Sequence, residues 1–177
     1  MAAEARRAFF ALWPPEPLAA RLLELSRCVP GRPMHWADLH LTLVFLGDLD
    51  STRLILVREI AAGLALPAEN LQAGFLAHWS HNTILWAGLQ RWPEPMVEFV
   101  DALHGRLRSA GFHLDPRRFT PHLTLARRAS PQAETLPALP EDLPTWNVTE
   151  WHLAATAEVS DSGLRYRKLA SWPARSS

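Results

Sequence analysis

Two stretches of the chain share one tetrapeptide: MHWADLHLTLVFLGD at residues 34–48 and RRFTPHLTLARR at residues 117–128. His-Leu-Thr-Leu begins at His40 in the first stretch and at His122 in the second, a separation of 122 − 40 = 82 residues. Such a repeat is the expected trace of an internal duplication in which each half of the chain supplies one copy. The sequence therefore predicts two similar lobes related by a pseudo-two-fold axis.

Each copy has the alternation of a β-strand with one polar face. Successive side chains of a strand point to opposite faces, so each histidine shares a face with the threonine two residues later, and the leucines anchor the other face. At about 3.3 Å per residue the histidine and threonine of one copy lie roughly 6.6 Å apart, a span that one phosphate can bridge. We expect the two polar faces to meet across a groove.

The segments around the two motifs predict an α+β fold rather than a doubly wound parallel sheet, because tight turns imply antiparallel hairpins. Helical periodicity indicates helices over residues 16–29, 48–65 and 94–111. Besides the two motif strands, β-like runs occupy residues 7–13, 71–79, 83–89, 146–159 and 164–172, and the proline-rich residues 129–144 indicate an exposed connection. We expect one domain over residues 1–177, with two pseudo-symmetric lobes, helices outside and a central cleft.

Composition limits the classes of partner. Of 177 residues, 48% are hydrophobic and 20% are charged, as in a globular protein, and a net charge of zero argues against a long nucleic-acid track. A single cysteine, Cys28, excludes an internal disulfide, and the opening residues contain no apolar run long enough for a signal or a membrane span. We expect a cytoplasmic monomer that does not enter a membrane.

A pair of histidines suits the hydrolysis of a phosphodiester without a metal. An imidazole titrates near ~6.5, so one neutral and one protonated ring can coexist near pH 7, the first activating water and the second protonating the leaving oxygen. Threonine hydroxyls can donate to the phosphate oxygens, where charge accumulates in the transition state. A lone histidine on a strand is more often structural, and the repeat is what favours His40 and His122 as catalytic residues.

The quoted stretches resemble the paired motifs of the two-histidine (2H) phosphoesterases. The opening RRAFFALWPPEP at residues 6–17 is also similar to the bacterial and archaeal branch called RNA 2′,3′-cyclic phosphodiesterases or, historically, 2′-5′ RNA ligases. The resemblance implies a bilobal fold with a water-filled cleft, no metal or nucleotide cofactor, and conversion of RNA 2′,3′-cyclic phosphate ends to 2′-phosphates. It implies that His40 and His122 are the acid–base pair. Thr42 and Thr124 would donate hydrogen bonds to the phosphate, and Arg127 would be the cation that follows the second motif.

Several assignments remain open at this point. We favour His122 as the base, although the near-symmetry of the motifs allows the two roles to be exchanged. Arg127 has the wrong parity to share a face with His122, whereas Arg128 has the right one, so a bulge or a strand end must intervene if Arg127 binds phosphate. The two arginines could instead be a solvated pair at the end of the strand.

Aromatic residues near the motifs offer stacking surfaces for a nucleobase. Phe119 and Trp36 are the preferred candidates, because Phe45 shares the leucine face by alternation and should be buried, and Phe9 and Phe10 point opposite ways. The other histidines show no metal-ligand spacing and are interpreted as surface or structural residues: His35, His78, His81, His104, His113 and His152.

Alternative functions use the same cleft. One is ATP-independent joining of RNA ends through a 2′-5′ bond, the chemical reverse of transesterification at the same site, and another is hydrolysis of a different cyclic phosphate. A third is a module that binds RNA ends or nucleotides without cutting them. The two histidines argue against mere binding, because arginine or lysine would hold a phosphate more reliably.

Overall fold

The computed structural model of the protein describes residues 6–131, 136–157 and 164–175. In chain order its elements are β1 (Arg6–Leu12), α1 (Glu16–Ser26), β2 (Arg32–Pro33), the 3-10 turn η1 (Trp36–Asp38), β3 (Leu41–Leu49), α2 (Ser51–Ala62), β4 (Leu66–Pro67), β5 (Asn70–Leu71), β6 (Ala73–Trp79), β7 (Ile84–Leu89), α3 (Glu94–Ser109), β8 (His122–Arg127), β9 (Trp146–Asn147), β10 (Glu150–Thr156) and β11 (Tyr166–Arg175). The predicted helices, motif strands and β6–β7 hairpin are confirmed. The predicted turn around residues 161–163 lies outside the described residues.

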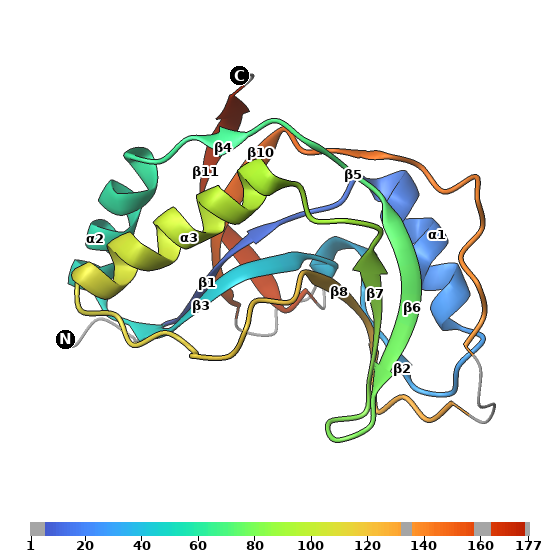
Figure 1. Ribbon diagram of the computed structural model, residues 1–177. Coiled ribbons are helices and arrows are strands. Elements are labelled where there is room, and N and C mark those ends of the chain that lie inside the picture. Colours follow the sequence, from blue (N-terminus) through green and yellow to red (C-terminus); the bar gives the residue numbers. More distant parts are fainter. Residues whose placement is uncertain (1–5, 132–135, 158–163, 176–177) are drawn as a thin grey trace.

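One sheet in the order β4-β11-β10-β1-β3-β8-β7-β6 runs through the molecule, and β2 pairs with β8 (Figure 1). Its described pairings are antiparallel except that of β11 with β4, which confirms the α+β class. The two motif strands, β3 and β8, meet at a single register pair, Leu41 with Leu123. The sheet therefore consists of two half-sheets joined at the motifs, as the duplicated tetrapeptide predicts.

The helices cover the outer side of both half-sheets. Figure 1 shows α2 and α3 over the half that contains β1 and β3, and α1 behind the half formed by β6, β7 and β8. The side chain of Asp50 caps α2 by accepting from the backbone N–H of Arg53 at 2.8 Å, and Gly111 follows α3 with a φ of 82°. The motif leucines lie in the resulting core as predicted, which leaves the histidine face uncovered by helices: Leu41, Leu43, Leu123 and Leu125.

A β-bulge in β3 turns the end of the first motif back toward the histidine face. Thr42 and Val44 pair with consecutive residues of β1, so Leu43 is an extra residue in the ladder. A bulge reverses the alternation beyond it, and Phe45 consequently shares the face of Thr42 and is 59% exposed. The prediction that Phe45 is buried with the leucines is wrong for this reason.

The second motif strand has its bulge at the equivalent place. Thr124 and Ala126 of β8 pair with consecutive residues of β7, so Leu125 is the extra residue. Arg127, which stands five residues after its histidine as Phe45 does, is thereby returned to the histidine face. This bulge resolves the parity problem that the sequence poses for Arg127.

Candidate active site

Four motif side chains form a two-by-two array at the junction of the half-sheets: His40, Thr42, His122 and Thr124. The antiparallel pairing of Leu41 with Leu123 sets each histidine beside the threonine of the other motif, on the face opposite the leucines. The two histidines occupy one diagonal of the array, a position in which Cα atoms lie about 7–8 Å apart. The structure thus brings the two histidines together, close enough for His122 to contribute to lowering the pKa of His40.

Both histidine rings are held in the same tautomer. Nδ1 of His40 lies 2.7 Å from the carbonyl oxygen of Asp38, and Nδ1 of His122 lies 2.8 Å from that of Thr120. A carbonyl oxygen can only accept, so Nδ1 must donate in each case. Within the described residues no protein group is hydrogen-bonded to Nε2 of either ring, so Nε2 is available to accept a proton when neutral or donate one when charged.

His40 is enclosed by aromatic rings that the fold brings from both ends of the chain. Phe9 and Trp13 stack on it, with ring centroids 4.8 Å and 5.1 Å away, and Tyr166 meets it edge-on at 4.8 Å. Burial lowers the pKa of His40 from 6.5 to about 4; the hydrogen bond to Asp38 opposes this shift, and the nearby His122 and Arg127 add to it. The neutral form of His40 is therefore strongly favoured at pH 7.

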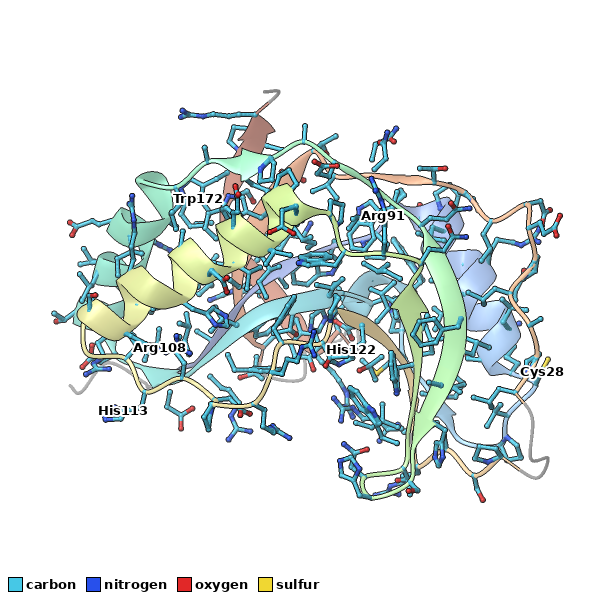
Figure 2. The ribbon with its side chains drawn as sticks, viewed as in Figure 1. Cys28, Arg91, Arg108, His113, His122 and Trp172 are labelled. Carbon is cyan, nitrogen blue, oxygen red and sulfur yellow. The ribbon has the colours of Figure 1, made fainter. Side chains whose placement is uncertain are left out.

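His122 lies in a different aromatic setting, provided by the β6–β7 hairpin. The ring of Trp79 meets it edge-on at 4.7 Å, and that of Trp86 lies 5.9 Å away. Burial lowers the pKa of His122, although its hydrogen bond to Thr120 opposes the shift. Figure 2 labels His122 near the middle of the molecule. His122 is less deeply buried than His40, so the environments of the two histidines differ although their motifs are nearly identical.

Asp38 ties His40 to the C-terminal strand. Its carboxylate is almost fully buried and accepts from the backbone N–H groups of Arg165 and Tyr166 at 3.0–3.3 Å. Its backbone carbonyl holds Nδ1 of His40. One residue thus fixes both the imidazole and the backbone of Tyr166, whose ring packs against that imidazole.

The predicted phosphate ligands lie on the face of the histidines. Thr42 and Thr124 are half-buried, and Arg127 is exposed at the end of β8. The positive charge of Arg127 reaches the site, because it contributes to lowering the pKa of His40. Geometry is therefore compatible with phosphate binding by these three residues, which stays a prediction.

The two predicted stacking residues are not brought to the histidine pair. Phe119 packs between Trp92 and His104 and is partly buried against the main core, and Trp36 is 47% exposed beside His35 on η1. Their role in binding a base stays a prediction without geometric support. The exposed ring of Phe45 lies on the histidine face, with its centroid 6.0 Å from that of Phe9.

A cavity of about 640 Å³ lies away from the histidine pair. Its described lining consists of His78, Thr83, Arg128, Ala129, Ser130, Pro131 and Leu136. His78 follows Ala77, which pairs with Trp86, so alternation places it on the opposite face of the hairpin from Trp86. This cavity shares no residue with the motif array, although residues of the proline-rich connection do border it.

Four of the remaining histidines have structural partners. Nδ1 of His35 accepts from the backbone N–H of Ala37. The ring of His78 contacts the carbonyl oxygen of Ala129, that of His104 contacts the carbonyl oxygen of Leu43, and that of His152 contacts the hydroxyl of Ser171. Among the described residues no three His, Cys, Asp or Glu side chains gather in an arrangement that could hold a metal ion. None of the helices in the described ranges combines the length and hydrophobicity needed to cross a bilayer.

The sequence signals of the aromatic enclosure are weak. Phe9, Ala11 and Trp13 alternate on one face of β1, which in principle indicates an aromatic face interrupted by a small residue. Nothing in the sequence indicates that Tyr166, more than 120 residues after His40, completes it. Asp38 has no recognisable signal, because a capping role and a buried tether look alike in the sequence.

Fold and site together define a phosphoesterase-like protein in which two His-x-Thr motifs meet at the junction of the half-sheets. The chain belongs to the 2′-5′ RNA ligase superfamily, whose family description matches residues 14–159. It is 28% identical over 173 residues to the RNA 2′,3′-cyclic phosphodiesterase of Escherichia coli, covering 96% of this chain and 97% of the relative. It is 30% identical over 160 residues to the protein of that name from Geobacillus stearothermophilus, covering 85% of this chain and 50% of the relative.

Solved structures agree with this assignment. Escherichia coli LigT in its apo form superimposes with a TM-score of 0.85 at 28% identity, covering 97% of this chain and 99% of LigT. LigT complexed with 3′-AMP gives a TM-score of 0.84 at 27% identity, and LigT complexed with phosphate gives 0.81, each with the same coverage. The α+β architecture predicted from the sequence is shared with these solved structures.

Proposed function

We propose that this protein is an RNA 2′,3′-cyclic phosphodiesterase that hydrolyses cyclic phosphate ends to 2′-phosphates. The observation that carries the proposal is the pair of imidazoles that meet at the junction of the half-sheets, each with Nδ1 fixed by a carbonyl and Nε2 available. The names of the Escherichia coli and Geobacillus relatives support the same substrate, and the LigT complexes with 3′-AMP and phosphate support a nucleotide site.

The proposed reaction needs one proton accepted and one proton donated. Nε2 of the basic histidine takes a proton from water as the water oxygen attacks phosphorus, and the bond from phosphorus to the ribose O3′ breaks. Nε2–H of the acidic histidine gives its proton to O3′, which leaves a 2′-phosphate and a free 3′-hydroxyl. We assign the stabilisation of the phosphate oxygens to the hydroxyls of Thr42 and Thr124 and to the positive charge of Arg127.

The assignment of the two proton-transfer roles follows from the environments of the rings. The sequence-based preference for His122 as the base stays a prediction. Burial supports the opposite assignment, because the base must be neutral before reaction and the pKa of His40, about 4, favours its neutral form strongly. In this assignment His122 carries the proton that goes to O3′.

The wider proposal keeps the other sequence-based expectations. Residues 1–177 act as one bilobal domain, a monomer in the cytoplasm, with RNA ends or nucleotides as partners and without a metal or organic cofactor. ATP-independent 2′-5′ joining at the same site is the second candidate, favoured by the name of the superfamily. A binding module without chemistry is the third.

One incubation tests the proposal. Purified protein is mixed with a 2′,3′-cyclic nucleotide and with a short RNA bearing that end, in the presence of a chelator, and the 2′- and 3′-phosphate products are separated by chromatography. We expect 2′-phosphate only. Joining would instead produce a longer RNA from two suitable ends, and a binding module would return the substrate unchanged.

A further inference from the structure

The histidine face continues sideways from the second motif onto the β6–β7 hairpin. His122 of β8 pairs with Gly88 of β7, which pairs with Phe75 of β6, and Thr124 pairs with Trp86. Neighbours in such a row point to the same face of a sheet, so Phe75 and Trp86 share the face of His122. The ring of Phe75 lies over Gly88, where a Cβ atom would collide with it.

Three aromatic rings form a continuous cluster here, which we call the hairpin platform: Phe75, Trp79 and Trp86. Trp79 is half-buried and Trp86 is buried beneath its neighbours. Phe75 contacts Trp86 with centroids 5.5 Å apart, Trp86 contacts Trp79 at 4.7 Å, and Trp79 contacts His122 at 4.7 Å. Phe75 is 46% exposed. The platform thus extends from the reaction centre to solvent along a hairpin that projects beyond the body of the protein (Figure 1).

The charges around the platform suit a polyanion. Residues 73–89, which comprise the whole hairpin, contain no aspartate or glutamate. Arg127 ends the neighbouring strand, where it pairs with Ile84, and Ile84 pairs with Trp79. A phosphate near the platform therefore has a guanidinium as a neighbour on the same face, and the hairpin itself presents no carboxylate that would repel it.

We propose that the hairpin platform binds the nucleobases that precede the cyclic phosphate in an RNA strand. Stacking on aromatic rings suits single-stranded RNA of any sequence, because every base has a flat apolar face, and the backbone can then pass the guanidinium of Arg127. The inference rests on the proposed function and deepens it: the preferred substrate is an RNA end of two or more nucleotides rather than a cyclic mononucleotide.

The test compares two substrates with the same cyclic end, a 2′,3′-cyclic mononucleotide and a trinucleotide. We expect the wild-type kcat/KM to be higher for the trinucleotide by at least about fivefold, the lower limit for stacking of one base. Phe75→Ala and Phe75→Leu, which both lack the ring, should lose this preference and keep mononucleotide turnover, and Phe75→Trp should retain it. Ile55→Ala is the matched control, because Ile55 is 57% exposed on α2, away from the hairpin.

Three outcomes would overturn the inference: a wild type without the trinucleotide preference, a Phe75→Ala variant that retains it, or an equal loss on both substrates. A dimer that Phe75→Ala dissociates in sedimentation would also overturn it, because a second copy would then cover the platform. If the wild type hydrolyses neither substrate, the proposed function fails. In that case fluorescence anisotropy with a labelled trinucleotide tests binding to the hairpin platform separately from catalysis. Phe75→Ala should still raise the Kd about fivefold or more.

Discussion

Nδ1 of His40 donates to the backbone carbonyl of Asp38 across 2.7 Å, while the carboxylate of Asp38 accepts the backbone N–H groups at the start of β11. This places one buried residue between the first histidine and the C-terminal strand. The orientation of the imidazole and the position of the ring of Tyr166 are therefore linked through Asp38, and the effect of changing it should appear in the chemistry and not only in the stability.

Replacing Asp38 should impair turnover without removing either histidine. Asp38→Ala keeps the carbonyl but leaves the N–H groups of Arg165 and Tyr166 without their acceptor, at a cost of about 1–3 kcal/mol in the free energy of unfolding. Misplacement of His40 should lower kcat about tenfold or more with little change in KM. Asp142→Ala, which removes only an exposed ion pair with Arg21, is the control. If the Asp38→Ala variant is less stable but has the wild-type kcat, Asp38 stabilises the fold and does not position His40 for catalysis.

Removing either histidine should abolish most of the activity. His40→Ala and His122→Ala are each expected to lower turnover of a 2′,3′-cyclic nucleotide by about 10²–10⁴-fold, with circular dichroism unchanged. His81→Ala, at the exposed tip of the hairpin, should retain wild-type turnover. Near-normal activity in either motif variant would exclude the acid–base pair.

The choice of acid and base can be read from a substrate that needs no acid. A 4-nitrophenyl phosphodiester releases a phenolate that leaves without a proton, so the variant that lacks the acid should recover much of its activity on this substrate, whereas the variant that lacks the base should not. We expect recovery in His122→Ala and none in His40→Ala. The reverse pattern would restore His122 as the base.

The pH dependence should be displaced toward acid. The active free enzyme has one neutral and one protonated ring, so kcat/KM falls when the base gains a proton and when the acid loses one. The pKa of His40 is lowered to about 4 and that of His122 is also lowered, by burial in both cases, which moves both limbs below pH 6.5. We therefore expect a bell-shaped kcat/KM profile with its acidic limb near pH 4, measured at substrate concentrations far below KM. A profile centred above pH 7 would contradict this expectation.

Phe45 should influence the binding of a mononucleotide. Its exposed ring lies on the histidine face, and loss of a stacking contact of about 1–3 kcal/mol would raise KM for a 2′,3′-cyclic nucleotide roughly 5- to 100-fold. Phe45→Ala and Phe45→Tyr make a matched pair, because the second keeps the ring. Equal KM values for the two variants would show that the ring does not bind the base.

The sequence predicts the large features because they follow from periodicity and from the repeat. The three helices and the hairpins follow from patterns that a single strand or helix carries, and the approach of His40 to His122 follows from the repeated motif. Asp50 and Gly63 stand at the two ends of α2, where the capping chemistry is local.

The features that the sequence does not reveal depend on the register between strands. Alternation predicts the wrong face for Phe45, because a bulge adds one residue without a signal in the local pattern. For Arg127 the sequence indicates that a bulge or strand end is needed but does not give its position. The enclosure of His40 by Tyr166 requires the order of strands in the sheet, which hydrophobic alternation does not specify. The lowering of the pKa of His40 to about 4 follows from that enclosure, and the sequence does not predict it either.

The junction at Leu41 and Leu123 is one residue pair wide, and each half-sheet contributes one imidazole and one hydroxyl to it. The proposed catalytic residues therefore lie at the junction of β3 and β8. Separate parts of the chain flank this junction: the β6–β7 hairpin on one side and the terminal strands on the other. Insertions or substitutions in the hairpin or in the terminal strands can change which molecule binds without altering the junction of β3 and β8. If the proposed proton-transfer pair acts as described, an architecture of this kind lets it serve substrates of different length and sequence.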